Sequence, residues 1–217
     1  MGVKVRFILT SFIKSGCRNK PSTCFFELIK GWKVIKSEFA DVNVSRYDTI
    51  SRRLHWLMAL LFAWIYCSAA AHYLLSDTAL DKLLWPYHKS IGLVLFVLLI
   101  VRVGWSIQRK RYRPKSISFA ASIGHKILYT LMFIIPLVGL LRQYGSGRAF
   151  SAFGLPVMGG FEGEKIQWMI DLGSDFHSLL GWVMALLVLA HVGAVARHYR
   201  RGELQVLRRM FGNAQED

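Results

Sequence analysis

The amino-acid sequence predicts an all-α integral membrane protein, built as a bundle of four transmembrane helices. Three observations lead to this fold class. The 217 residues are 53 % hydrophobic and have a positive mean hydropathy. The apolar residues are concentrated in four runs, each long enough to cross a hydrocarbon core about 30 Å thick. Most of the Lys and Arg residues lie on one side of the membrane that these runs define.

Residues 1–43 form a basic N-terminal extension, in which short apolar runs alternate with Lys, Pro and Gly. Its start has the basic and apolar regions of a signal peptide. The apolar region is weak and no small-residue cleavage motif follows, so we expect no cleaved signal. An interfacial amphipathic segment, a disordered segment and a stretch that precedes the true translation start all stay open. Of the three cysteines, Cys17 and Cys24 lie here and Cys67 lies later, with no C-x-x-C motif.

Residues 44–211 form the membrane domain, and residues 212–217 a polar tail. The four expected spans cover about 54–75, 87–107, 122–142 and 177–197. Trp or Tyr lies near several span ends, as interfacial residues do. Pro136 predicts a kink in the third span, which neighbouring helices can accommodate. The Gly-rich connection 143–176 predicts a structured surface loop with a short helix near 162–172.

The distribution of basic residues predicts the orientation. Of the 28 Lys and Arg residues, 23 lie in the two terminal segments (1–54 and 197–217) and in the loop 102–126. Only 5 lie in the loops 73–89 and 142–176. The positive-inside rule therefore places both termini in the cytoplasm. The formal net charge of +15 is then a topology signal that also attracts anionic lipid, and no nucleic-acid motif accompanies it.

This topology predicts the depth of four histidines in the membrane. His177 and His191 lie fourteen residues apart in the fourth span, which returns them to within about 40° of one helix face and separates them by about 21 Å. His88 begins the second span at the outer side, level with His177. His55 begins the first span at the inner side, level with His191. Coordinating groups at such depths are functional-site candidates by default.

Two cross-helix histidine pairs at two depths fit two bis-histidine haem b sites. Iron with an imidazole on both axial faces is suited to electron transfer. Three of the histidines have a small residue four positions further into the membrane, on the same face, where a flat macrocycle needs clearance: Ala59, Gly92 and Gly181. His191 has Leu187 in that place, with Gly193 close by.

Other interpretations of the histidines stay open. Each could be a hydrogen-bonded structural residue, and zinc or copper could use such pairs, although no carboxylate or thiolate ligand accompanies them. His72 lies about 100° from the face of His55. We expect an interfacial role for His72, with an outer ligand as the alternative. His125 and His198 lie among Lys and Arg at cytoplasmic ends and are expected to be solvated, with His198 a rival to His191.

Six motifs carry a family resemblance: SRRLHW at 51–56, H-x3-G at His88, GHKILYTLMFIIPLVGL at 124–140, AFGLP at 152–156, FHSLLGW at 176–182 and LAHVGAVARHY at 189–199. Their order and spacing resemble a bacterial di-haem cytochrome b561, within the cytochrome b561/Ni-hydrogenase b-subunit group. The resemblance implies a four-helix bundle in the inner membrane with two b haems, ligated by His55 with His191 and by His88 with His177. It also implies electron exchange with the quinone pool, with ubiquinone as substrate.

The sequence thus predicts an electron-transfer oxidoreductase that relays single electrons between a periplasmic donor or acceptor and the quinone pool. The candidate partners of haem propionates, or else interfacial anchors, are Arg52, Arg53 and Arg102 at the inner side and Lys89, Arg142 and Arg148 at the outer side. The periplasmic partner could be superoxide, a soluble redox protein or a dehydrogenase anchored by this chain. The alternatives are a membrane-anchor subunit of a larger respiratory complex and a non-redox transporter, against which no inverted repeat is found.

Overall fold

The computed structural model describes residues 46–211. The basic extension 1–43, with Cys17 and Cys24, and the polar tail 212–217 therefore lie outside the described residues. The described chain forms, in order, α3 (Thr49–Leu74), α4 (Ala79–Leu84), η1 (Trp85–Tyr87), α5 (His88–Gln108), η2 (Lys110–Tyr112), α6 (Phe119–Gly145), β1 (Phe150–Ala152), β2 (Leu155–Met158), α7 (Gln167–Arg200) and α8 (Gln205–Phe211).

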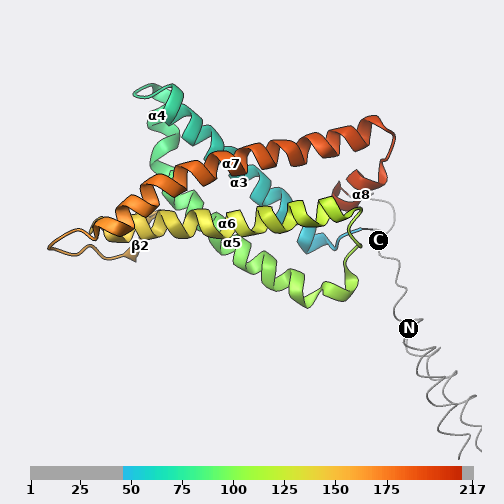
Figure 1. Ribbon diagram of the computed structural model, residues 1–217, viewed down its shortest axis with the longest axis horizontal. Coiled ribbons are helices and arrows are strands. Elements are labelled where there is room, and N and C mark those ends of the chain that lie inside the picture. The colour runs from blue at the N-terminus through green and yellow to red at the C-terminus, as the bar shows by residue number, and fades with distance from the viewer. Residues whose placement is uncertain (1–45, 212–217) are drawn as a thin grey trace, which may run out of the picture. The chain divides into compact units, whose positions relative to one another are not determined.

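Four helical segments are long and apolar enough to cross a bilayer, which confirms the predicted fold class. These segments are Thr49–Leu74, Ala79–Gln108, Phe119–Gly145 and Gln167–Arg200. The second joins α4, η1 and α5. Figure 1 shows α3, α5, α6 and α7 as the long helices, with α4 and the β-hairpin at one end and α8 at the other. Following the predicted orientation, we refer to these as the outer and the inner end.

The fourth long helix is longer than the sequence indicated. α7 begins at Gln167, ten residues before the expected span, and the short helix expected near 162–172 is absorbed into its first turns. No proline interrupts this stretch, and Gly173 lets it lie against α6. A Cβ at Gly173 would collide with the Cβ of Arg142 and lie 3.0 Å from the carbonyl oxygen of Val138. His177 therefore lies well inside a continuous helix rather than at its start.

The start of α3 is fixed by Asp48. Its carboxylate accepts hydrogen bonds from the Ser51 backbone N–H (3.0 Å), the Ser51 hydroxyl (2.7 Å) and the Trp105 indole N–H of α5 (3.0 Å). Burial by itself raises the pKa of this carboxyl. The hydrogen bonds outweigh burial, so the pKa of Asp48 lies below its usual value of 3.8. Asp48 is thus both the N-cap of α3 and a tie to the inner end of α5.

The long helices pack in a sequential order. α6 lies along α7, α3 packs on α5, and α5 packs on α6. A small buried core of Met58, Leu95 and Leu99 joins α3 to α5. At the inner end, α8 returns to the start of α3, where the Trp56 indole N–H donates to the Met210 carbonyl oxygen (3.3 Å). At the outer end, β1 and β2 form an antiparallel hairpin between α6 and α7.

Candidate functional site

The bundle brings together the two histidines of the outer level. The imidazole rings of His88, at the start of α5, and His177, in α7, have centroids 6.4 Å apart and planes inclined at 70°. Two metal–nitrogen bonds of about 2 Å on opposite sides of one ion, plus roughly 1 Å from each nitrogen to its ring centre, put the two centroids about 6 Å apart. The spacing of this pair therefore matches the spacing that axial coordination of one iron requires.

Ser68 sets the protonation of the His88 ring. The Ser68 hydroxyl is fully buried and donates to the Ile65 carbonyl oxygen at 2.8 Å. The Ser68 hydroxyl oxygen also lies 2.8 Å from Nδ1 of His88. Since the hydroxyl proton is already used, the Ser68 oxygen can only accept, and Nδ1 of His88 carries the hydrogen. Nε2 of His88 is then unprotonated and free to bind a metal.

His177 has the same protonation for a different reason. Its Nδ1 lies 3.0 Å from the backbone carbonyl oxygen of Ile135 in α6. A carbonyl can only accept, so Nδ1 again carries the hydrogen and Nε2 is free. Gly139 allows this approach, because a Cβ there would lie 2.8 Å from Nδ1 and 2.9 Å from Cε1 of the same ring. Each outer histidine thus has a second partner that orients the ring.

The Ser68 contact leads to a first prediction. Ser68→Ala removes the oxygen that accepts from Nδ1 of His88, and partners of this kind are typically worth 10- to 100-fold in metal affinity or activity. We expect weaker retention of the outer haem during purification and a shifted midpoint potential for that haem. Redox titration of the purified variant measures both. Ser90→Ala is the matched control, because Ser90 is also buried but contributes no hydrogen bond to either histidine. An unchanged potential and full occupancy in Ser68→Ala would contradict this role.

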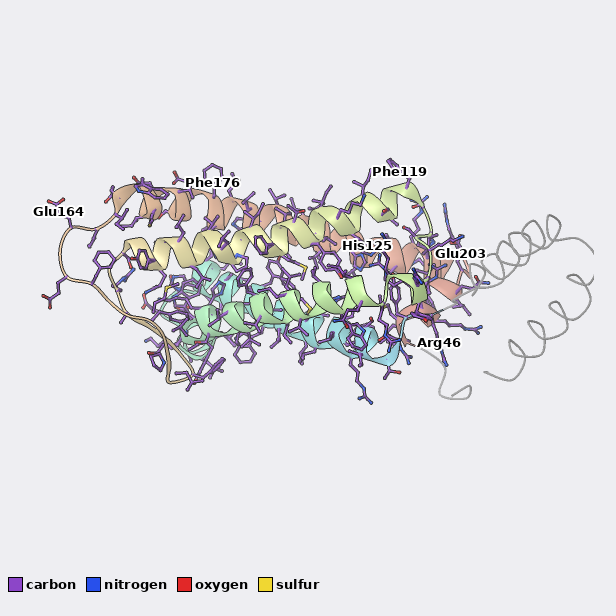
Figure 2. The ribbon with its side chains drawn as sticks, turned by 90° about the horizontal axis from the view of Figure 1, so that it is seen from below. Arg46, Phe119, His125, Glu164, Phe176 and Glu203 are labelled. Carbon is purple, nitrogen blue, oxygen red and sulfur yellow. The ribbon has the colours of Figure 1, made fainter. Side chains whose placement is uncertain are left out.

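The inner level contains three histidines rather than two. His191 of α7 lies beside His125 of α6, with ring centroids 5.5 Å apart and planes at 71°. His55 of α3 lies within electrostatic range of both. His125 is exposed, in keeping with the expectation that it is solvated, and its ring also contacts His191, which was not expected. Figure 2 places His125 toward the end of the bundle that carries Arg46 and Glu203, opposite Glu164.

The inner rings are not arranged for coordination as the outer rings are. The Arg102 guanidinium contacts Nδ1 of His55 through both terminal nitrogens, at 3.2 and 3.3 Å. Arginine can only donate, so Nδ1 of His55 accepts and the hydrogen of the neutral ring lies on Nε2. Iron binding through Nε2 requires Arg102 to release the ring. Among the described residues, no three His, Cys, Asp or Glu side chains gather into a metal site of their own.

The predicted basic residues fall into two pockets and several single contacts. At the inner end, Arg52 and Arg53 line an open pocket of about 520 Å³ with Trp56 and Phe211. Arg52 donates to the Phe211 carbonyl oxygen at 3.2 Å, while its buried Nε has no hydrogen-bond partner among residues 46–211.

At the outer end, Arg142, Arg148 and Lys165 line a pocket of about 280 Å³. Lys89 donates to the Gln143 side chain at 3.1 Å and lies within electrostatic range of Arg148 and Arg142. Arg142 also lies within electrostatic range of His177. Four of the five outer basic residues thus gather near the outer histidine pair.

The remaining histidines have partners of their own. Nδ1 of His72 contacts the Asp81 carboxylate at 3.0 Å, and its ring stacks on Trp85, which fits the expected interfacial role. Nδ1 of His198 contacts the Glu203 carboxylate at 2.5 Å. Neither residue forms a histidine–histidine ring contact like that of His88 with His177.

Sequence reasoning missed several residues that shape this site. Gly139 had a signal, since it lies three residues after Pro136 in an apolar span, but nothing in the sequence shows which ring approaches it. Ser68 is a small polar residue in an apolar run, which indicates a buried hydrogen bond without naming its partner. Of the predicted small residues, a Cβ added at Gly181 would meet no described neighbour within 4 Å, and one added at Gly92 would lie 3.9 Å from Cδ1 of Ile65, so both positions leave room beside a ligand helix.

Comparison with known proteins identifies the family of this chain. Residues 46–213 match the family model described as prokaryotic cytochrome b561. The chain belongs to the prokaryotic cytochrome b561 family. Cytochrome b561 homolog 2 of Escherichia coli (strain K12) is 28 % identical over 186 residues, which cover 79 % of this chain and 94 % of that protein. A Yersinia pestis protein named probable superoxide oxidase CybB is 27 % identical over 176 residues, covering 76 % and 96 %.

Cytochrome b561 homolog 1 of Escherichia coli (strain K12) is 25 % identical over 178 residues, which cover 77 % of this chain and 98 % of that protein. The predicted family is thereby confirmed. As a cytochrome b561, this multi-pass membrane protein is an electron-transfer protein, and its family implies b-type haem. Among the described residues, the outer histidine pair, with ring centroids 6.4 Å apart and both Nδ1 atoms hydrogen-bonded, fits such a group best.

Proposed function

We propose that this cytochrome b561 binds two haem b groups without covalent attachment and relays single electrons between a donor at the outer surface and ubiquinone in the membrane. The observation that carries the proposal is the outer pair. The His88 and His177 rings lie 6.4 Å apart, and hydrogen bonds at both Nδ1 atoms leave both Nε2 atoms free. His88 and His177 would hold the iron of a bound haem, which would then be suited to electron transfer rather than oxygen binding.

Each protein group has a distinct part in this site. Ser68 and the Ile135 carbonyl oxygen hold the protons at Nδ1 of the two ligands and thereby fix the ring orientations. Because Gly139 has no Cβ, the His177 ring can pack closely against α6 at this position. A bound haem supplies a reversible one-electron couple, whose potential these contacts adjust.

We propose His55 and His191 as the ligands of the second haem, at the inner level. Their depths in α3 and α7 match, and His191 lies on the same face of α7 as His177. Arg102 would then exchange its contact with His55 for a haem propionate, a stronger partner for a guanidinium. Arg52 and Arg53 are further candidates for propionate contacts, and Gly92 and Gly181 for clearance beside the macrocycles.

We also propose that residues 44–211 carry this function in the inner membrane, with both termini in the cytoplasm. The support is the sequence count of 23 basic residues in the segments 1–54, 102–126 and 197–217, against 5 in the segments 73–89 and 142–176. Aromatic residues near the helix ends, such as Trp56 and Trp85, suit the two interfaces.

Haem quantification tests the proposal directly. Purified protein should release its haem into acidified acetone, because no covalent attachment motif is present, and a pyridine haemochrome assay should approach about two haems per chain. A value near one would restrict the site to the outer pair. An absence of haem in protein isolated from haem-replete membranes would refute the proposal.

The quinone part needs its own measurement. In proteoliposomes, a short-chain ubiquinol added anaerobically to the oxidised protein should reduce the haem absorption bands within the mixing experiment. Heat-denatured protein with the same haem content is the control for direct chemical reduction. If dithionite reduces the haem bands and the quinol does not, ubiquinone is not the membrane partner. The proposed haem sites would not be affected by that result.

A small anionic donor is the outer partner that a specific observation favours. Arg142, Arg148 and Lys165 gather around one pocket near His177, at the end of the bundle that is otherwise poor in basic residues. Clustered positive charge raises the local concentration of anions and speeds their encounter. Superoxide is such an anion, and the Yersinia pestis relative carries the name superoxide oxidase.

A further inference from the structure

A second group of ring contacts reaches the outer haem site. The Trp85 ring, in η1, contacts two histidine rings. The His72 ring lies parallel to the Trp85 ring, with centroids 3.7 Å apart and planes at 4°. The ring of His88 lies 4.9 Å from the Trp85 ring, with planes at 36°. His88 is the outer ligand proposed above, so this row of rings ends at the haem site.

The stack is held in place by Asp81. Aromatic rings ordinarily prefer offset or edge-on contacts over parallel stacking. Here one Asp81 carboxylate oxygen binds Nδ1 of His72 at 3.0 Å, while the other accepts the Asp77 backbone N–H at 3.1 Å. Asp81 is only 10 % exposed, which gives it a fixed position. The Asp81 carboxylate, through its contact with Nδ1, therefore holds the His72 ring parallel to the Trp85 ring.

The outer end of the stack is open. The His72 side chain is 45 % exposed and Trp85 is 39 % exposed. Tyr73 and Leu74, beside His72 at the end of α3, are among the most exposed large residues. A redox partner can thus contact the exposed edges of His72 and Trp85, neither of which lines the basic pocket of Arg142, Arg148 and Lys165.

We propose that the His72–Trp85 stack is a second electron-entry route to the outer haem, used by a one-electron donor that is not an anion. This inference rests on the proposed haem at His88 and His177. The donor would give up one electron to an oxidised haem held by His88 and His177, and no proton would be transferred. The electron crosses Trp85 by tunnelling, so the indole is neither oxidised nor reduced. Asp81 positions His72, and His72 and Trp85 provide the contact.

The test compares two outer reductants of opposite charge in proteoliposomes. Hexaammineruthenium(II), a cation, should be disfavoured by the basic pocket and should enter through the stack. Trp85→Leu should slow stopped-flow reduction of the outer haem by this probe, because it removes the ring that lies 4.9 Å from the ring of His88. Trp85→Phe, which keeps a ring, should retain most of the rate. Trp182→Leu is the matched control, because Trp182 is an exposed indole that pairs with Tyr73 and not with His88.

Further measurements distinguish a loss of electron entry in Trp85→Leu from damage to the outer haem site. The haem content, the outer-haem absorption spectrum and its midpoint potential should be the same in Trp85→Leu and in the unchanged protein. Reduction by dithionite, an anion with access through the basic pocket, should also keep its rate. An unchanged rate with the ruthenium probe, or an equal slowing with both reductants, would overturn the inference. Lack of haem in the unchanged protein would instead refute the proposed function.

Discussion

Replacing either outer histidine should remove the same haem. His88→Ala and His177→Ala each delete one of two imidazole nitrogens whose rings lie 6.4 Å apart across one site. An iron left with a single axial ligand, beside a cavity where the ring was, is held much more weakly. We expect both variants to fall from about two to about one haem per chain, with superimposable reduced-minus-oxidised spectra. Each should also be less stable, because bound haem stabilises the folded state.

The controls for this experiment are histidines with partners of another kind. His198→Ala removes a ring that contacts Glu203 at the inner end and should keep both haems. His72→Ala should also keep the outer haem, because the His72 ring contacts Asp81 and Trp85 instead of the ligand pair. If His72→Ala bleaches the outer haem while His88→Ala leaves it intact, the outer ligand is wrongly assigned. Different spectra for His88→Ala and His177→Ala would separate the two residues into different sites.

A single methyl group added at Gly139 should reduce the outer-haem content nearly as much as replacing an outer histidine. In Gly139→Ala the new Cβ would lie 2.8 Å from Nδ1 and 2.9 Å from Cε1 of His177, closer than real Cβ contacts allow. The ring must move away, which breaks its hydrogen bond to the Ile135 carbonyl oxygen. We expect loss of the outer haem and a destabilisation of about 1–3 kcal/mol, the usual cost of overpacking. Haem quantification and thermal unfolding measure the two effects.

Gly124→Ala is the matched control in the same helix. No atom lies within 4 Å of a Cβ placed at Gly124, and alanine is the better helix former by up to about 1 kcal/mol. This variant should keep both haems and be as stable as the unchanged protein or slightly more so. Full outer-haem occupancy in Gly139→Ala would show that His177 does not need the close approach to α6.

The sequence by itself determined the four membrane helices and the level of each histidine. A segment in lipid must satisfy its own backbone hydrogen bonds, so an apolar run of about 20 residues can only be a helix. The helical rise and period then convert the spacing of His177 and His191 into a depth and a face. The family followed from motifs around these same residues, and the match over residues 46–213 confirmed it.

Only the tertiary structure decided which side chains meet. A sequence gives each helix its own faces but not its rotation against its neighbours, and that rotation selects every cross-helix partner. Ser68 beside His88, Gly139 beside His177 and Trp85 beside both His72 and His88 all depend on it. The inner level shows the same dependence, because the packing of α6 along α7 brings His125 to His191 although its own sequence neighbours are charged. Local periodicity places residues along one helix, whereas side-chain packing between helices places them across the bundle.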